Sequence, residues 1–395
     1  MRILLLSHAP VVHTQRWAAA LKGRGHEVRL LTVEAAPWAA DPGRVIGPRF
    51  PLRAFRYPAA RGDVMRETRD FRPEATVAHF LPNYGFLAAL AGASPLLLVC
   101  WGSDLLINAT RSPFHRARAR YTLRHSDLVH VDARLLARAA ARLGAPEDRI
   151  WTRPWGVDTD ALAPRTPWEA RRAGAPEPRL LWTRRLAPLY DPETFVRALG
   201  LLRRRGVSFQ ATIAGEGPLR PALEALARDL EIGASVRFAG WVGEEDLRAL
   251  YRSHEIYVSL SRSDSTSQSL LEAMAAGLVP VVSDIEGNRE WVTHRSEGLL
   301  VPPGDAEAVA RAIAEVVGAG VAAGGGASGG AGGRTGVGTR APAAMAERSR
   351  ARVAREASFA DTVAETEARL AALAALAGAR GHARGRSRPP EGAPR

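Results

Sequence analysis

The stretch RILLLSHAPVVHTQRWAAALKGRGHEVRLLTV, residues 2–33, decides the fold. Its pattern predicts a buried strand over residues 2–7, a helix over 14–24 and a second strand over 27–33. Gly23, Gly25 and His26 mark the turn after the helix. A strand, a helix and a strand in this order form a β-α-β unit, which joins two parallel strands. The sequence therefore predicts a parallel α/β sheet at the N-terminus.

The same alternation continues along most of the chain. The next predicted strands are 75–79, 96–100 and 128–131, and the next helices are 113–125 and 134–143. Proline-rich sequence over 155–178 interrupts the pattern, and a second series begins beyond it. Its strands are 180–183, 211–214, 236–239, 256–260, 279–282 and 299–301, and its helices start near Pro218, Glu244, Gln268 and Asp305, with one more capped by Asp191. Two doubly wound sheets predict two Rossmann-like domains, residues 1–160 and 161–317, facing a central cleft.

The C-terminal part divides by composition. Residues 318–343 are nearly all Gly, Ala, Ser and Thr, which predicts a flexible linker. Residues 344–377 regain helix-forming residues and predict a C-terminal helix that docks. Residues 378–395 are rich in Arg, Gly and Pro and predict a disordered basic tail.

Composition limits the class of protein. The 395 residues exceed the size of one growing core, and 46% of them are hydrophobic, which favours a globular chain of two domains. The single cysteine, Cys100, closes an apolar run and predicts core packing, not a disulfide. The net charge of +13 is compatible with an anionic partner. Because Lys22 is the only lysine, an Arg-, Ala- and Gly-rich coding bias explains the charge equally well, and no nucleic acid is expected.

Three segments bear on membrane association. Residues 80–103 carry no charge, but polar residues, glycine and proline divide them into a helix-like and a strand-like piece, which disfavours a membrane span. The N-terminal apolar run is too short for a signal peptide, so a cytoplasmic protein is expected. The helix 113–125 carries Arg116, Arg118, Arg120 and Arg124. It predicts either a solvated face or a peripheral contact with an anionic membrane.

The segment SRSDSTSQSLLEAM, residues 261–274, is the strongest candidate for chemistry. A loop of small polar residues follows a strand and opens directly into a helix, whose unpaired N–H groups attract phosphate. Glu272, two helical turns on, suits the hydroxyls of a ribose, and Asp264, at the strand end, suits the hydroxyls of a sugar. An ordinary helix cap with solvated acids explains the same residues.

This segment resembles the family-four retaining glycosyltransferases of the GT-B fold, in which two acids separated by seven residues bind the donor. Asp264 and Glu272 have that spacing, although Asp264 stands where the family has Glu. Further motifs match in order, and the resemblance covers residues 1–317. They are Arg24-Gly25-His26-Glu27-Val28, Gly102-Ser103-Asp104, Trp155-Gly156-Val157-Asp158, Gly215-Glu216-Gly217-Pro218 and Val236-Arg237-Phe238-Ala239-Gly240.

The resemblance implies roles for individual residues. The catalytic residues would be Arg185, Asp104 and Asp264. The donor would be bound by Arg184, Gly215, Gly217, Phe238, Ser267, Gln268, Ser269 and Glu272, and the acceptor by His13, Thr14, Arg16 and Trp101. No metal and no cofactor are implied, because the nucleotide-diphosphate sugar is itself a substrate.

Besides Asp264, the chain departs from the family pattern at three places. Val11-Val12-His13-Thr14 replaces a pair of glycines, and Trp101 stands in place of a histidine before Gly102. Tyr190 stands where a lysine would follow Arg185. The last change leaves Arg185, with Arg184 beside it, to balance the diphosphate.

The function implied is a retaining, metal-independent transfer of a sugar, of hexosyltransferase type, to a hydroxyl of a glycan or lipid-linked acceptor. Cell-envelope polysaccharide or glycolipid synthesis is the setting that the family suggests. Two alternatives share the architecture: a nucleotide-sugar epimerase, and a noncatalytic nucleotide-sugar binder, which the changes at Trp101 and Tyr190 would favour.

Overall fold

The computed structural model describes residues 1–48, 53–318 and 340–386. The chain forms two compact units. Unit 1 consists of residues 1–154 together with the chain from residue 360 onward, and unit 2 consists of residues 155–359. Each unit is built on one parallel sheet, as the alternation of strands and helices predicts.

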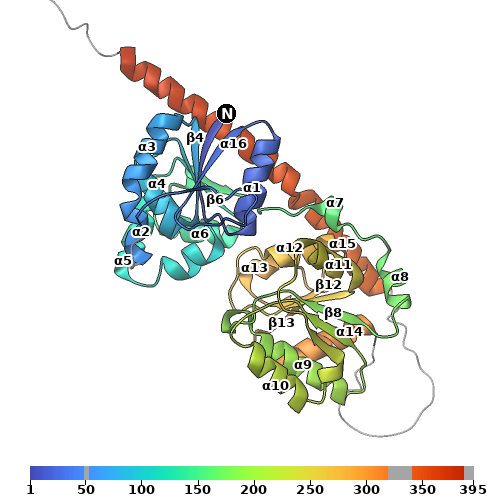
Figure 1. The fold of residues 1–395 in the computed structure, drawn as a ribbon. Coiled ribbons are helices and arrows are strands. Elements are labelled where there is room, and N and C mark those ends of the chain that lie inside the picture. The colour runs from blue at the N-terminus through green and yellow to red at the C-terminus, as the bar shows by residue number, and fades with distance from the viewer. Residues whose placement is uncertain (49–52, 319–339, 387–395) are drawn as a thin grey trace, which may run out of the picture. The chain divides into compact units, whose positions relative to one another are not determined.

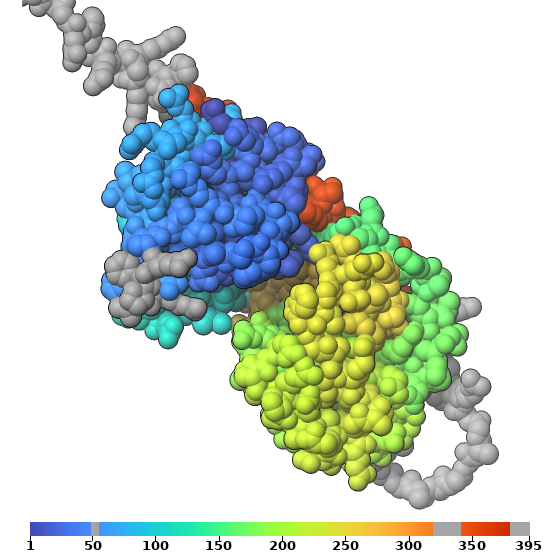
Figure 2. Space-filling model, in the orientation of Figure 1, coloured from blue at the N-terminus to red at the C-terminus, as the bar shows by residue number. Residues whose placement is uncertain are grey.

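Unit 1 contains a seven-stranded sheet in the order β3-β2-β1-β4-β5-β6-β7. In Figure 1, α1 lies on one side of this sheet, and α3 and α4 lie on the other. In the space-filling view, the N-terminal part of the chain, in blue, forms most of the visible surface of this unit (Figure 2). Its strands are β1 (Arg2–Leu6), β2 (Glu27–Thr32), β3 (Arg44–Val45), β4 (Ala75–His79), β5 (Leu96–Val99), β6 (Leu128–Val131) and β7 (Ile150–Thr152). Its helices up to residue 142 are α1 (Val12–Gly23), α2 (Arg53–Ala59), α3 (Arg61–Phe71), α4 (Phe86–Leu90), α5 (Pro113–Arg124) and α6 (Arg134–Arg142), with a helical turn η1 (Phe80–Gly85).

Unit 2 contains a six-stranded sheet in the order β10-β9-β8-β11-β12-β13. Figure 1 shows α9 and α10 on one side of it and α11 and α12 on the other. Its strands are β8 (Arg179–Trp182), β9 (Gln210–Ile213), β10 (Val236–Phe238), β11 (Ile256–Ser259), β12 (Val279–Ser283) and β13 (Leu299–Val301). Its main helices are α7 (Thr159–Leu162), α8 (Trp168–Ala173), α9 (Pro192–Arg204), α10 (Arg220–Asp229), α11 (Glu244–Ser253), α12 (Gln268–Ala275), α13 (Glu286–Arg289), α14 (Ala306–Val317) and α15 (Arg340–Glu356).

Three short elements, β3, β7 and α8, were not predicted from the sequence pattern. β3 has two residues and both are exposed, so it carries no apolar run. β7 has three residues, of which one is buried. α8 holds its place through Trp168 and through Arg171, whose guanidinium bonds the carbonyl oxygens of His254, Ala276 and Gly277. Such elements depend on partners far away in sequence, which periodicity does not register.

The C-terminal helices separate where the sequence predicts one helix over 344–377. α15 packs on unit 2, with Met345, Ala346 and Val353 buried in its cores. α16 (Phe359–Arg386) begins after a short break and packs on unit 1, where Glu367 pairs with Arg24 and His26. The boundary between the units lies at 154/155, ahead of the predicted 160/161. Residues 319–339 of the predicted linker and 387–395 of the predicted tail lie outside the described residues.

The structure tests two local expectations, the helix cap at Asp191 and the fold of the uncharged segment 80–103. Asp191 occupies the position before α9, but its side chain makes no capping hydrogen bond, so the predicted cap is wrong. Its carboxylate Oδ2 lies 2.9 Å from Arg262 Nη2 instead. The uncharged segment 80–103 folds as η1, α4 and β5, and among the described residues no helix has the length and apolarity that crossing a bilayer requires.

Candidate functional site

The first site lies where the sheet of unit 2 changes direction. β8 pairs with β9 on one side and with β11 on the other, so the chain leaves β8 and β11 toward opposite faces. Ligands of doubly wound sheets bind in the crevice outside the carboxyl ends of such strands. The residues that follow β8 include Arg184 and Arg185, and those that follow β11 include Asp264 and Ser267. The topology therefore brings together residues about eighty positions apart in sequence.

Arg184 joins the two loops. Its Nη2 lies 2.5 Å from Asp264 Oδ2, and its Nη1 donates to the hydroxyls of Ser267 at 2.9 Å and Ser269 at 3.1 Å. The guanidinium carbon lies 4.5 Å from the centre of the Tyr190 ring. Burial is the largest single influence on Arg184 and opposes its charge, but the Asp264 carboxylate and the neighbouring tyrosines together outweigh it, so the pKa of the guanidinium is raised. The two side chains are 14% and 19% exposed, so the pair is partly open to a ligand.

Arg185 differs from its neighbour. Its side chain is exposed, and among the residues described by the structure no hydrogen bond or ion pair involves its guanidinium. Arg185, the predicted catalytic cation, therefore lies at the switch point with an exposed guanidinium, whereas the guanidinium of Arg184 forms an ion pair with Asp264. The same loop holds both, because β8 ends at Trp182.

The start of α12 completes the charged cluster. Ser267 caps the helix by accepting from the backbone N–H of Leu270, at 3.4 Å, in addition to the bond from Arg184. Tyr257 donates to Ser269 Oγ at 2.7 Å, and Tyr251 donates to Glu272 Oε2 at 3.2 Å. Glu272 is half-buried, and burial of Tyr251, together with the charge of Glu272, raises the pKa of Tyr251 well above the ordinary value.

The predicted donor-binding glycines hold the loops together. A Cβ on Gly215 would lie 2.4 Å from the carbonyl oxygen of Arg184, and one on Gly217 would lie 2.2 Å from that of Leu186. Any side chain there would push the 184–186 loop away from β9. Of the other predicted donor residues, Phe238 is half-buried against the core, and Gln268 donates to the carbonyl oxygen of Gly156 at 2.6 Å.

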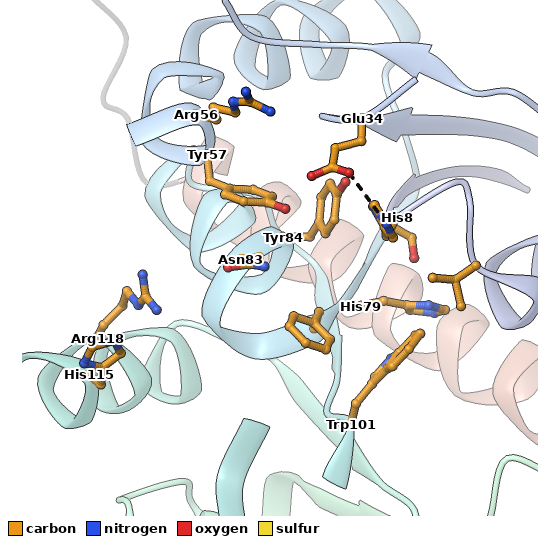
Figure 3. Close-up of a pocket in the computed structure, with 13 residues that line it drawn as sticks. His8, Glu34, Arg56, Tyr57, His79, Asn83, Tyr84, Trp101, His115 and Arg118 are labelled. Carbon is orange, nitrogen blue, oxygen red and sulfur yellow. Dashed lines mark ion pairs between the residues drawn. The ribbon is translucent and has the colours of Figure 1, made fainter. Parts of the chain in front are cut away.

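The second site is a pocket at the switch point of unit 1, where β1 pairs with β2 on one side and β4 on the other. Its cavity has a volume of about 580 Å³, in the range of small-molecule sites. Figure 3 shows the lining side chains, which come from the ends of several strands and from α2, η1 and α5. They are Ser7, His8, Val11, Glu34, Arg56, Tyr57, His79, Phe80, Asn83, Tyr84, Trp101, His115 and Arg118.

Aromatic rings and neutral histidines form one part of this pocket. Phe80 and Trp101 meet edge to face with centroids 5.5 Å apart, and His13 meets Trp101 in the same way at 5.9 Å. Phe80 has a positive φ of 70°, a costly conformation for a bulky residue. Burial lowers the pKa of His79 to about 3 and, with the charge of Arg16, that of His13 to about 4, so both rings are neutral at pH 7.

The predicted acceptor-side residues lie at different depths. Trp101 lines the pocket, whereas His13 is not among the described lining residues and contacts the edge or face of the Trp101 ring. Thr14 is fully buried, with its hydroxyl 2.7 Å from that of Ser7, and Arg16 is half-buried beside His13.

Asp104 is fully buried under the pocket. Its Oδ2 accepts from the backbone N–H groups of Leu81 and Trp101, each at 2.9 Å, so it ties together the loops that follow β4 and β5. Burial raises the pKa of this carboxyl to about 7, against the two hydrogen bonds. Its contacts are those of a residue that positions Trp101.

Several pocket residues were not predicted from the sequence. His79 ends β4, Phe80 comes directly after it at the start of η1, and Glu34 follows β2, so the rule that strand ends face the site points to all three. Arg118 and His115 lie within the predicted helix 113–125, and no local pattern points from this helix into a pocket at the ends of β1 and β4.

Two doubly wound parallel sheets, each with polar residues at its switch point, define the GT-B architecture. Residues 169–319 match the family described as Glycosyl transferases group 1, and residues 9–156 match the Glycosyl transferase 4-like domain. The chain belongs to the group 1 glycosyltransferases and is an enzyme of this family, for which retaining and metal-independent transfer is typical.

Individual proteins agree with this assignment. The chain is 28% identical over 324 residues to the GDP-mannose-dependent alpha-(1-6)-phosphatidylinositol monomannoside mannosyltransferase of Mycobacterium tuberculosis, covering 77% of this chain and 79% of that one. It is 25% identical over 244 residues to the amylovoran biosynthesis glycosyltransferase AmsK of Erwinia amylovora, covering 58% and 59%. Anabaena HepE, solved in complex with UDP, matches with a TM-score of 0.73 over 94% of this chain and all of that one; at 16% identity this likeness shows the fold.

Proposed function

We propose that this enzyme transfers a sugar, with retention, from a nucleotide diphosphate to a hydroxyl of a glycan or lipid-linked acceptor. The carrying observation is the cluster of Arg184, Asp264, Ser267 and Ser269 at the switch point of unit 2, beside the available charge of Arg185. Positive charge and helix N–H groups suit a diphosphate. The acceptor belongs in the pocket of unit 1.

The relatives support the two substrate classes. The mycobacterial relative is named for GDP-mannose and a phosphatidylinositol monomannoside, and the Erwinia relative for the polysaccharide amylovoran. HepE was solved with UDP. These names support a nucleotide-sugar donor and a cell-envelope glycolipid or polysaccharide as the product.

Arg185 would act on the leaving group. As the bond between the sugar carbon and the diphosphate oxygen breaks, negative charge grows on the diphosphate, and a guanidinium that binds this charge more tightly in the transition state raises kcat. The acceptor hydroxyl forms the new bond on the same face of the sugar, and its proton passes to the departing diphosphate. This route needs positioning and charge, and no strong protein base.

Arg184 would hold the sugar-binding acid in place. Asp264 receives its ion pair on Oδ2 and the backbone N–H of Ser265 on Oδ1 at 3.0 Å, so the carboxylate has a defined orientation toward sugar hydroxyls. Glu272 would accept from the ribose hydroxyls, and Gly215 and Gly217 would keep the loop close. Asp104 would serve the reaction by positioning Trp101.

We also propose a cytoplasmic location with peripheral contact to an anionic membrane through α5. Phe114 is 69% exposed at the start of this helix, and Arg116 and Arg120 are exposed beside it. An apolar ring beside cationic side chains suits an anionic headgroup layer. Equal sedimentation of the protein with neutral and anionic vesicles at low salt would contradict this contact.

The test is thermal stability in the presence of UDP, GDP and ADP, followed by turnover assays with the corresponding nucleotide sugars. A ligand that binds only the native state raises the apparent melting temperature, so the preferred nucleotide is identified first. Product formation that requires an acceptor supports transfer. Isomerisation of the donor alone would indicate an epimerase, and a stability shift without product would indicate a noncatalytic binder.

A further inference from the structure

The pocket of unit 1 has two chemically different ends. At one end His8 Nε2 lies 3.9 Å from Glu34 Oε2, and Glu34 is the one acid among the described residues that line the pocket. Across the pocket from this pair, His115 and Arg118 extend from α5 (Figure 3). The aromatic rings of Phe80 and Trp101, which contact each other, also line the cavity.

Arg118 carries a charge that its own surroundings do not balance. Its side chain is half-buried, and in the described ranges, which omit residues 49–52, no carboxylate pairs with it and no hydrogen bond is made by its guanidinium. Its nearest partners are the rings of Phe86 and Phe114, whose centroids lie 5.6 Å and 5.9 Å from Cζ. Burial alone lowers the pKa of Arg118. A partly desolvated cation without an acid gains most from an anion brought by a ligand.

The remaining lining suits a sugar. Apolar faces of pyranose rings pack on aromatic side chains, and Phe80 and Trp101 offer two of them. Glu34 and Asn83 are able to bond hydroxyls. A volume of about 580 Å³ holds one sugar ring with a substituent.

We propose that the acceptor is a sugar or polyol bearing an anionic group, a phosphate or a carboxylate, with Arg118 bound to that group. The ring lies on the aromatic side chains, and its hydroxyls face Glu34 and His8. The proposal rests on the proposed function, because it names the acceptor class of the same reaction. It makes Arg118 the residue that selects anionic over neutral acceptors.

The experiment is a binding measurement without donor. Full-length protein is titrated with glucose, galactose and mannose and with their phosphate monoesters, observed by ligand NMR, with inorganic phosphate as a third probe. At least one sugar phosphate should bind about ten-fold more tightly than its neutral sugar, the lower end of the range for a charge-assisted bond. In Arg118→Gln the two affinities should become equal through loss of phosphate-ester binding alone, and Arg118→Lys should keep part of the preference.

Two control variants locate the effect. Arg120→Gln removes an exposed arginine of the same helix and should change neither affinity. Arg185→Ala tests whether the esters bind at the donor site of unit 2. A preference that survives Arg118→Gln but disappears in Arg185→Ala overturns the proposal, as does equal binding of neutral and anionic sugars, or binding of neither, by the unmodified protein. Since no donor is present, failure here leaves sugar transfer untouched, and absence of transfer leaves this binding measurable.

Discussion

The two units place their sites at the same topological position but fill them with different side chains. At the switch point of unit 2, charged and hydroxyl groups bond one another through Arg184, which satisfies Asp264, Ser267 and Ser269. At the switch point of unit 1, rings and neutral histidines dominate, and burial keeps His13 and His79 uncharged at pH 7. The shared topology therefore selects where a ligand binds, and the side chains at the strand ends select which ligand.

Under the proposed function, the difference follows from the two substrates. A leaving diphosphate gains charge as the bond to the sugar breaks, so its site needs fixed cations. An attacking hydroxyl stays neutral until its proton leaves, so its site needs shape and packing. Substitutions at the site of unit 2 should accordingly change donor affinity and kcat, and substitutions at the pocket of unit 1 should change the KM for the acceptor.

The largest effect is expected from Arg185→Ala, which should lower kcat by roughly a hundred- to a thousand-fold, by analogy with removal of one preorganised donor to a developing anion. Arg185→Lys should recover only part, because an ammonium lacks the forked geometry. Steady-state kinetics with saturating acceptor measure both. If Arg184→Ala abolishes kcat while Arg185→Ala leaves it near normal, the roles of the two arginines are reversed.

A pH effect on stability should separate unit 1 from unit 2. The folded-state pKa of Asp104 is raised to about 7 from 3.8, so the folded state binds this proton more tightly than the unfolded state. The resulting stabilisation is full below pH 3.8 and is lost as the pH rises toward 7, with a slope of about 1.4 kcal/mol per pH unit. In Asp104→Asn, which keeps an acceptor oxygen, that slope should be absent.

Hydrogen exchange of β4 and β5 measured from pH 4 to 8 reports this unit alone, since both strands belong to its core. The difference between the unmodified protein and Asp104→Asn isolates Asp104 from the histidines. Parallel stability curves for the two proteins would show that Asp104 does not titrate in this range.

Glu272→Ala should weaken donor binding by roughly ten- to a hundred-fold while leaving the fold intact, because its proposed partners are ribose hydroxyls. Calorimetry with the preferred nucleotide measures the dissociation constant. Glu193→Ala, which removes an exposed acid paired with Arg197, is the control and should change nothing. An unchanged dissociation constant in Glu272→Ala would remove this residue from the donor site.

The smallest effect is expected from Trp101→Ala, about three- to ten-fold in the KM for the acceptor, from the loss of ring packing. The KM for the donor should stay constant, because Trp101 belongs to the pocket of unit 1. Trp38→Ala, on an exposed ring of the same unit, serves as the control. A loss confined to the donor KM would reverse the assignment of the two sites.

Much of the fold was predictable because parallel strands are buried on both faces. β1, β4, β5 and β6 are apolar runs between helices, and their predicted bounds agree with the observed ones within a residue. The N-cap role of Asp191 was wrong because this residue adopts a left-handed backbone conformation, with φ 52° and ψ 50°, instead of the extended one typical of a capping residue, and its carboxylate lies beside Arg262. A single C-terminal helix was predicted where α15 and α16 pack on different units, since composition does not register which core a helix face meets.

By itself the sequence determined the alternation, the two parallel sheets and the family, because each depends on local periodicity or on motifs within a few residues of one another. Only the tertiary structure decided the division of labour between Arg184 and Arg185, the burial of Asp104 and the entry of Arg118 into the pocket. Arg184 and Arg185 are adjacent on one loop, but their side chains point in different directions. The burial of a side chain such as Asp104 depends on segments far away in the chain. The physical reason is that periodicity encodes the face of an element, whereas the partner of that face is set by the packing of the whole domain.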